Sequence, residues 1–180
     1  METKCEQDTT SSAMLSFEQW ALNRIGGYAR REPKPFDKNQ QRPDIEWHID
    51  GRRYYFDVSL THPLNSTIVA KAARVQLAAA SQKEHEKNTK YLKMCKDINS
   101  EFIPVVFESY GGYGKQFKLF LTYLRTIAYR NLTFTDGAFI IDDMLNQIAY
   151  HIICLNGLIM KLASSRSDDL NTRISRNRAW

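Results

Sequence analysis

Two aspartates, Asp44 and Asp57, lie at equal distances from an Asp50-Gly51 pair that separates two segments rich in β-forming residues. Asp-Gly between such segments predicts a β-hairpin with a two-residue turn. Pairing across this turn places Asp44 opposite Asp57 on one face of adjacent strands. Because opposed like charges destabilise a sheet, the placement suggests a shared divalent cation. Carboxylate oxygens suit Mg²⁺ or Mn²⁺, and a metal held in this way supports phosphodiester hydrolysis.

A row of lysines further along the chain offers a cation for the phosphate. Lys83, Lys87 and Lys90 are spaced i, i+4, i+7, so they share one face of a predicted helix. Tyr91 follows Lys90 directly. The alternative interpretation is a solvated helix face, on which glutamates such as Glu86 pair with the lysines.

The motif Pro43-Asp44, followed after twelve residues by Asp57-Val58-Ser59, resembles the PD-(D/E)XK nuclease superfamily. In this chain Ser59 occupies the place of the final lysine of that motif. The variant in which the lysine migrates to the following helix is characteristic of one group of relatives. These are the restriction-like endonuclease domains at the carboxy terminus of site-specific non-LTR retrotransposon reverse transcriptases. The similarity covers roughly residues 42–125, including the segment FIPVVFESYGGYG.

The resemblance implies a role for each matching residue. Asp44 and Asp57 would be the metal ligands, with Mg²⁺ or Mn²⁺ as the cofactor. Lys87 is the best candidate for the migrated catalytic lysine, and Lys90 is the second. Tyr91 would support the lysine by packing or by contacting phosphate. The alternative is that Asp57 caps a turn and Asp44 lies exposed at a strand start.

Further polar residues are candidates for supporting roles. Some members of the superfamily add a glutamate from the first helix, and Glu18 is the only acid in that predicted helix. Glu108 is another possible acid near the site. The candidate contacts to nucleic acid are the lysines of the helix row and of the segment after the glycine turn: Lys83, Lys87, Lys90, Lys115 and Lys118.

The predicted elements must bring these residues together. Their order is α–β–β–α–β–α–α, which indicates an α/β or α+β class with a restriction-endonuclease-like core: a small mixed sheet, containing a β-hairpin, flanked by helices. Residues 30–42 are expected to form a loop, and Pro104 suggests that the third strand lies at an edge or that a strand starts there. The expected helices and strands span residues 13–25, 44–49, 52–60, 65–96, 102–109, 115–130 and 135–162.

Composition bounds the domain organisation. The chain has 180 residues, 25 Lys and Arg against 20 Asp and Glu, and 43% hydrophobic residues, which is typical of a single folded domain. We expect a disordered tail at residues 1–12, one nuclease-like domain at 13–163 and a basic polar tail at 164–180. The three cysteines are too far apart to predict a disulfide framework or a zinc site.

Location and partners follow from the same features. The first residues show no secretory signal, so an intracellular protein is expected, nuclear if its source is eukaryotic. The apolar segment 138–162 is interrupted by Asp142 and Asp143, which favours a core helix over a membrane span, and no membrane partner is expected. The chain begins with a methionine and contains no reverse-transcriptase segment, as expected of a free-standing or excised domain.

Three functions remain open at this stage. The leading hypothesis is a metal-dependent DNA endonuclease associated with a mobile element, which could act as a homodimer. The second is a catalytically decayed module of the same fold that binds nucleic acid, which the serine at position 59 favours. The third is an assembly component that self-associates through the apolar face of residues 138–162.

Overall fold

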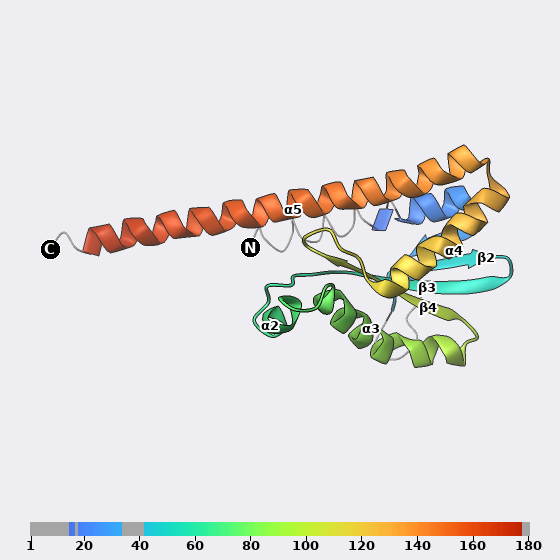
Figure 1. Cartoon of the computed structure of the whole chain (residues 1–180), viewed down its shortest axis with the longest axis horizontal. Helices are drawn as coiled ribbons and strands as arrows, with labels where there is room; N and C mark the ends of the chain where they lie inside the picture. Colours follow the sequence, from blue (N-terminus) through green and yellow to red (C-terminus); the bar gives the residue numbers. More distant parts are fainter. Residues whose placement is uncertain (1–14, 17, 34–41, 178–180) are drawn as a thin grey trace.

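Helices cover both faces of a four-stranded mixed sheet in the described part of the chain (Figure 1). The computed structural model describes residues 15–16, 18–33 and 42–177, with side chains through Lys161. The predicted tail at residues 1–12 lies outside these ranges. The strands, in spatial order, are β1 (Tyr28–Arg31), β2 (Ile45–Ile49), β3 (Arg52–Thr61) and β4 (Glu101–Glu108). The helices are the N-terminal helix (residues 18–25), α2 (Val69–Ala72), α3 (Ala78–Asp97), α4 (Lys115–Asn131) and α5 (Phe134–Asn177).

The predicted hairpin is confirmed as the antiparallel pair β2 and β3. Ile45 lies opposite Phe56 and Ile49 lies opposite Arg52, so the turn consists of Asp50 and Gly51 alone. Both turn residues have positive φ angles, 49° and 71°. This backbone conformation matches the twist of the flanking strands, which is why Asp-Gly favours it.

The strand β4 pairs with β3 in the parallel sense, so the chain must cross over between them. The helix α3 makes this crossover. In the described residues β4 is the last strand of the sheet, so of the two positions that Pro104 suggests, an edge or a strand start, the structure has the edge, where proline need not donate a ladder hydrogen bond.

The prediction of a loop over residues 30–42 is wrong at its beginning, because Tyr28–Arg31 forms the edge strand β1. This strand pairs with β2, and Ala29 lies opposite Trp47. Gly26 and Gly27, with φ angles of 130° and 83°, turn the chain out of the N-terminal helix. The strand is short and half of it is arginine, so its sequence carries no alternating pattern. Residues 34–41 of the predicted loop lie outside the described ranges.

The helix expected from residue 65 begins only at Ala78. Leu77 has a left-handed backbone with φ 58°, which ends the preceding turns, and the one-turn helix α2 occupies part of the segment before it. The backbone N–H of Ala80 donates to Oε1 of Glu108 at 2.9 Å, so a residue from β4 caps the new helix.

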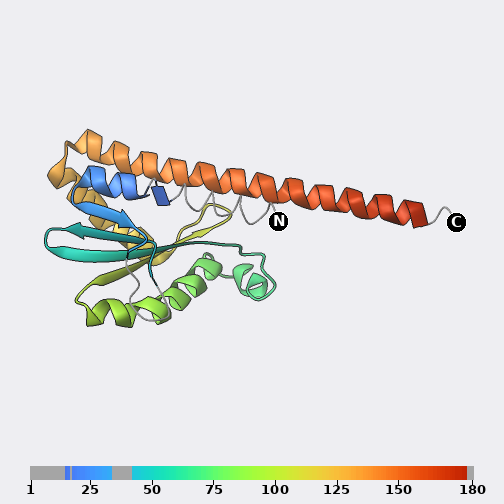
Figure 2. The same cartoon turned by 180° about the vertical axis from the view of Figure 1, so that it is seen from behind.

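The last helix starts and ends at different residues than expected. Thr133, rather than Thr135 or Asp136, caps it, and its hydroxyl accepts a hydrogen bond from the N–H of Asp136 at 3.1 Å. The helix then continues past residue 162 to Asn177, because no glycine or proline interrupts residues 162–177. Figures 1 and 2 show α5 running along the body and then projecting well beyond it.

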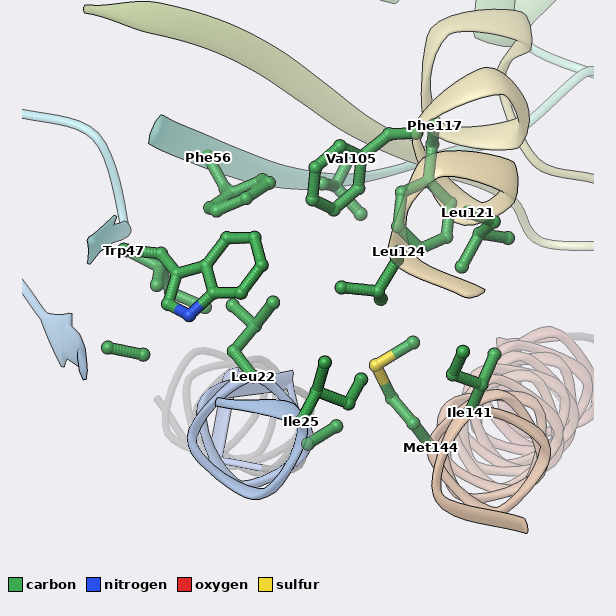
Figure 3. Packing of buried hydrophobic residues seen from close by; sticks show 14 of the residues in the cluster. Leu22, Ile25, Trp47, Phe56, Val105, Phe117, Leu121, Leu124, Ile141 and Met144 are labelled. Atoms are coloured by element: carbon green, nitrogen blue, oxygen red, sulfur yellow. The ribbon is translucent and has the colours of Figure 1, made fainter. Parts of the chain in front are cut away.

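Two clusters of buried side chains lie on opposite faces of the sheet. The main core fills the space between the sheet, the N-terminal helix, α4 and α5, and Figure 3 shows Trp47, Phe56, Leu124 and Met144 meeting there. The second cluster lies beneath α3 and is much smaller: Tyr55, Tyr91, Cys95 and Phe102.

Length and composition alone would let the segment Phe134–Lys161 of α5 cross a membrane. One face of this segment is packed into the main core, however, through Ile141, Met144 and Ile148. One face of the helix therefore packs in the main core, and the rest of the described chain leaves the opposite face uncovered.

Candidate active site

The carboxylate pair lies on the face of the sheet that α3 covers. Asp57 is in the middle of β3 and is 4% exposed. Asp44 directly precedes β2, and its N–H donates to the carbonyl of Phe56 at 2.8 Å, although the ladder pairs Phe56 with Ile45, so the pairing shifts by one residue at this end of the hairpin. The spacing predicts Asp44 directly opposite Asp57; the ladder ends at Ile45, and Asp44 lies beyond it, close enough to Asp57 to feel its charge.

The two carboxylates repel each other. Burial, together with the negative charge of Asp57, raises the pKa of Asp44 to about 6. The N–H of Val58, which donates to Oδ2 of Asp44 at 2.6 Å, and the charges of Lys87 and Lys90 offset part of this rise. A divalent cation between the two groups would remove the repulsion.

Lys87 reaches the pair from α3 and forms an ion pair with Oδ2 of Asp57. The Lys87 side chain is 19% exposed and that of Asp57 is 5% exposed, so the contact is largely shielded from water. A buried charge is costly unless it is paired, and this contact supplies the pairing. The residue expected as the migrated lysine thus lies directly at the carboxylates.

Lys90 and Tyr91 lie one turn further along α3. The ammonium of Lys90 lies 4.4 Å from the centre of the Tyr91 ring. The ring is buried, and its hydroxyl donates to the carbonyl of Arg42 at 2.9 Å. Burial, with the nearby charge of Asp57, raises the Tyr91 pKa. Tyr91 therefore ties the segment before Asp44 to α3 and fixes the distance between the carboxylates and the lysines.

Glu18 does not join this group, although it was expected as a third acid. It points from the N-terminal helix into the main core and lines a cavity of about 20 Å³ together with Leu22, Ile45 and Met144. Its carboxyl group is fully buried and has no hydrogen-bond partner among the described residues. Burial, then the charge of Asp44, raises the Glu18 pKa to about 8, so at neutral pH this group carries a proton.

The donor set suits a hard cation with two protein ligands. Within the described ranges no three His, Cys, Asp or Glu side chains gather closely enough to enclose a metal. Mg²⁺ commonly keeps several waters and binds through one or two carboxylates. Asp44 and Asp57 fit that requirement, since each carboxylate has a second oxygen besides the one already engaged.

The remaining predicted lysines are distributed over two layers. Lys83 lies on α3 one turn before Lys87, forms an ion pair with Glu86 at 2.9 Å, and lines a cavity of about 130 Å³ at the end of β3. Lys115 and Lys118 are exposed at the start of α4, whose apolar side packs in the main core on the opposite face of the sheet. Of the predicted lysines, only Lys87 and Lys90 therefore act on the charge of Asp44, whereas Lys83 pairs with Glu86 and Lys115 lies near Glu84 at the start of α4.

Two buried glutamates position the helix that carries Lys87. Oε1 of Glu108, a candidate acid of the site, instead accepts the N–H of Ala80 and caps α3. Glu84 of α3 accepts the N–H of Gln116 at 2.8 Å and so caps α4. No short sequence motif identifies these caps, because donor and acceptor are 28 and 32 residues apart.

A second buried carboxylate on the α3 face was not anticipated. Glu46, two residues after Asp44, accepts hydrogen bonds from Arg30 and from the hydroxyl of Tyr55, and it lies 2.9 Å from His48. These partners lower the Glu46 pKa although burial alone would raise it. In the sequence, only the alternation of Glu46 with apolar β2 residues such as Ile45 and Trp47 hints at its position. Its partner Arg30 could not be predicted, because Arg30 lies in the strand β1, where a loop is expected.

No family model matches the sequence, and no curated protein matches it.

Proposed function

We propose that this chain is a metal-dependent endonuclease that hydrolyses phosphodiester bonds in DNA and belongs to a mobile element. The observation that carries the proposal is the contact of Lys87 with Asp57, with Asp44 close by at the start of β2. Two neighbouring carboxylates and an adjacent ammonium combine cation ligands with a positive charge for phosphate. Metal-dependent phosphodiester hydrolysis uses both.

The proposed fold is a restriction-endonuclease-like core. Support comes from the mixed sheet, in which the hairpin of β2 and β3 is extended by the parallel strand β4 and flanked by helices on both faces. The carboxylates lie on the hairpin and the lysine lies on the crossover helix α3. This is the placement that the migrated-lysine variant of the superfamily implies.

Each residue has a defined part in the proposed reaction. Asp44 and Asp57 would hold Mg²⁺ or Mn²⁺, which when bound lowers the pKa of a water and stabilises charge on the phosphate. The ammonium of Lys87 neutralises negative charge that develops on the phosphoryl oxygens in the transition state. Tyr91 holds the two parts together, and Lys90 and Lys83 extend the positive charge along α3 toward the flanking phosphates.

The test is the cleavage of supercoiled plasmid with Mg²⁺, Mn²⁺ or EDTA. The wild-type chain should nick the plasmid only with metal, and Asp57→Ala should lower the rate by at least about a hundredfold, as expected for loss of an electrostatic group in a catalytic site. Asp97→Ala, at the exposed last residue of α3, is the matched control and should nick at the wild-type rate. Equal rates for Asp57→Ala and wild type, or nicking in EDTA, would contradict the proposal.

The lysines can be separated in the same assay. Lys87→Met should lower the nicking rate by about a hundredfold, whereas Lys93→Met, on an exposed position of the same helix, should have little effect. Lys90→Met should fall between them, because this ammonium lies over the Tyr91 ring rather than on a carboxylate. A greater loss for Lys90→Met than for Lys87→Met would exchange the roles of the two lysines.

The second candidate function is a module of the same fold that binds nucleic acid without cutting it. Ser59, which takes the place of the final lysine of the motif, favours it, since a hydroxyl cannot supply a positive charge. In that case no metal would support nicking, while salt-sensitive DNA binding would persist in Asp57→Ala.

A further inference from the structure

The outer face of α5 carries a stripe of apolar residues that the described chain leaves uncovered. Four large side chains on this face are exposed: Phe139 by 65%, Tyr150 by 61%, Ile153 by 68% and Met160 by 73%. The opposite face of the helix is packed in the main core. We call the exposed set, together with Gly157, the outer seam of α5.

The members of the outer seam share one face of the helix. Tyr150, Ile153, Gly157 and Met160 follow one another at steps of three, four and three residues, so their side chains lie in one row; the preceding positions at this spacing are Asn146 and Asp143. A Cβ atom added at Gly157 would meet no heavy atom within 4 Å, so the helix surface is open there. A second helix can therefore approach the backbone closely at this position.

Charge indicates which helix fits. The segment from Met144 to Met160 contains no Asp, Glu, Lys or Arg, whereas Asp142 and Asp143 lie before it and Lys161 follows it. An identical helix laid antiparallel therefore brings its basic end to the acidic end of the first. A parallel arrangement would set like charges side by side at both ends.

The antiparallel register also matches the seam. With the two-fold axis between His151 and Ile152, Asp142 of one copy lies beside Lys161 of the other, and Tyr150 lies beside Ile153. Asp142 is exposed and 3.7 Å from Arg125 of its own chain, a surface contact that leaves the carboxylate open to a second cation. The same residues thus meet twice across the axis, as a symmetric dimer requires.

The size of the seam is sufficient for a dimer. Each of the four large side chains is more than 60% exposed, so pairing two copies buries on the order of 1,000 Å² of accessible surface, the lower end of what is expected of a specific interface. Figures 1 and 2 show that the body of the protein lies on the other side of α5. Two bodies therefore do not collide when the outer faces meet.

We propose that the outer seam of α5 binds a second copy of this chain in an antiparallel, two-fold symmetric helix pair. The pairing does not depend on the proposed nuclease activity. It places the two carboxylate sites on opposite sides of the paired helices.

The first test is the mass of the full-length protein in solution, measured by sedimentation equilibrium over a concentration series. The wild-type chain should form a reversible dimer. Ile153→Glu places a charge at the centre of the seam in both copies and should weaken the dimer at least about a hundredfold. Leu119→Glu, at a 62% exposed apolar position of α4 outside the seam, should leave it unchanged. Circular dichroism checks that both variants keep their helices.

The second test addresses the orientation. Asp142→Lys and Lys161→Asp should each weaken the dimer, and the double variant should restore it, because opposite charges again face each other across an antiparallel pair. Three results would overturn the proposal: a wild-type chain that is monomeric throughout, a dimer insensitive to Ile153→Glu, or a double variant that fails to regain the dimer. A monomer that sediments with phosphatidylcholine vesicles, and loses this property in Ile153→Glu, would assign the seam to a lipid surface instead.

Discussion

The two faces of the sheet bury different kinds of side chain. On the face covered by α4 and α5, the core is built from large apolar residues such as Trp47 and Phe56, with Glu18 as an isolated carboxyl group. Beneath α3 the apolar clusters are small, with four buried members under the middle of the helix and three around its first turn, and Asp57 and Glu46 are buried on the same face of the sheet. One face thus gains stability from apolar burial, and the other contains charges that oppose it.

This difference indicates where function lies. Burying charged groups costs free energy, and apolar replacements of similar size are often as stable or more stable. The α3 face nevertheless holds two neighbouring carboxylates, an ammonium in contact with one of them and a tyrosine that ties Arg42 to α3. The catalytic site that we propose would account for this cost in stability, whereas packing alone does not.

The largest expected effect on stability is a substitution in the main core. Trp47 is fully buried, its ring packs at 6.2 Å from that of Phe120, and its indole N–H donates to the carbonyl of Gly26. Trp47→Ala should lower the free energy of unfolding by about 4 kcal/mol. Urea denaturation measures it, with Trp20→Ala at a 40% exposed position as the control. A loss of similar size in both variants would mean that burial in the main core, on the α4 and α5 face of the sheet, is not what stabilises the fold.

The next effect concerns the isolated carboxyl group in that core. Folding raises the Glu18 pKa from its ordinary value to about 8, so the folded state binds the proton more tightly than the unfolded state. The stabilisation that this proton contributes is complete below the pKa of Glu18 in the unfolded chain. It is lost as the pH rises through the pKa of Glu18 in the folded protein. Between about pH 5 and pH 7.5 the wild-type chain should therefore lose roughly 3 kcal/mol of stability through this group.

Glu18→Gln should remove this pH dependence, because an amide has no proton to lose in that range. Urea denaturation of both proteins across the pH series gives the difference directly. Glu32→Gln, at an exposed position, should keep the wild-type profile. If Glu18→Gln and wild type change in parallel with pH, the carboxyl group is ionised at neutral pH and has a partner in the folded protein.

A smaller effect is expected from the cap that positions α3. Glu108→Ala removes the acceptor for the N–H of Ala80 and should cost about 1–2 kcal/mol of stability. It should also slow plasmid nicking, because the first turn of α3 would no longer be held to β4 and Lys87 lies on that helix. Glu101→Ala, at the exposed start of β4, controls for the loss of charge. Unchanged nicking in Glu108→Ala would show that Lys87 is positioned without the cap.

The local parts of the site were predictable from the sequence. Alternation around Asp50-Gly51 specifies the hairpin, and the hairpin brings Asp44 close to Asp57, although the ladder itself ends at Ile45. The position of Lys87 could be anticipated only through a resemblance, because helical spacing shows that the lysines share a face but not what the face meets. The contact with Asp57 depends on how the crossover helix lies against the sheet.

The parts that were predicted wrongly depend on contacts between distant residues. The strand β1 is too short and too charged to show a pattern, and its pairing with β2 defines it. The start of α3 is determined by Glu108, which lies beyond the end of that helix in the sequence. The burial of Glu18 follows from its packing against Ile45 and Met144, whereas a glutamate on a helix is ordinarily exposed.

The most direct test of the central claim is the binding of Mn²⁺ to the protein, followed by electron paramagnetic resonance. It does not require the DNA target to be known. The wild-type chain should bind Mn²⁺ at one site, Asp57→Asn should weaken the binding at least about tenfold, and Asp97→Asn should leave it unchanged. Equal Mn²⁺ affinity in all three proteins would contradict the assignment of Asp44 and Asp57 as a metal site.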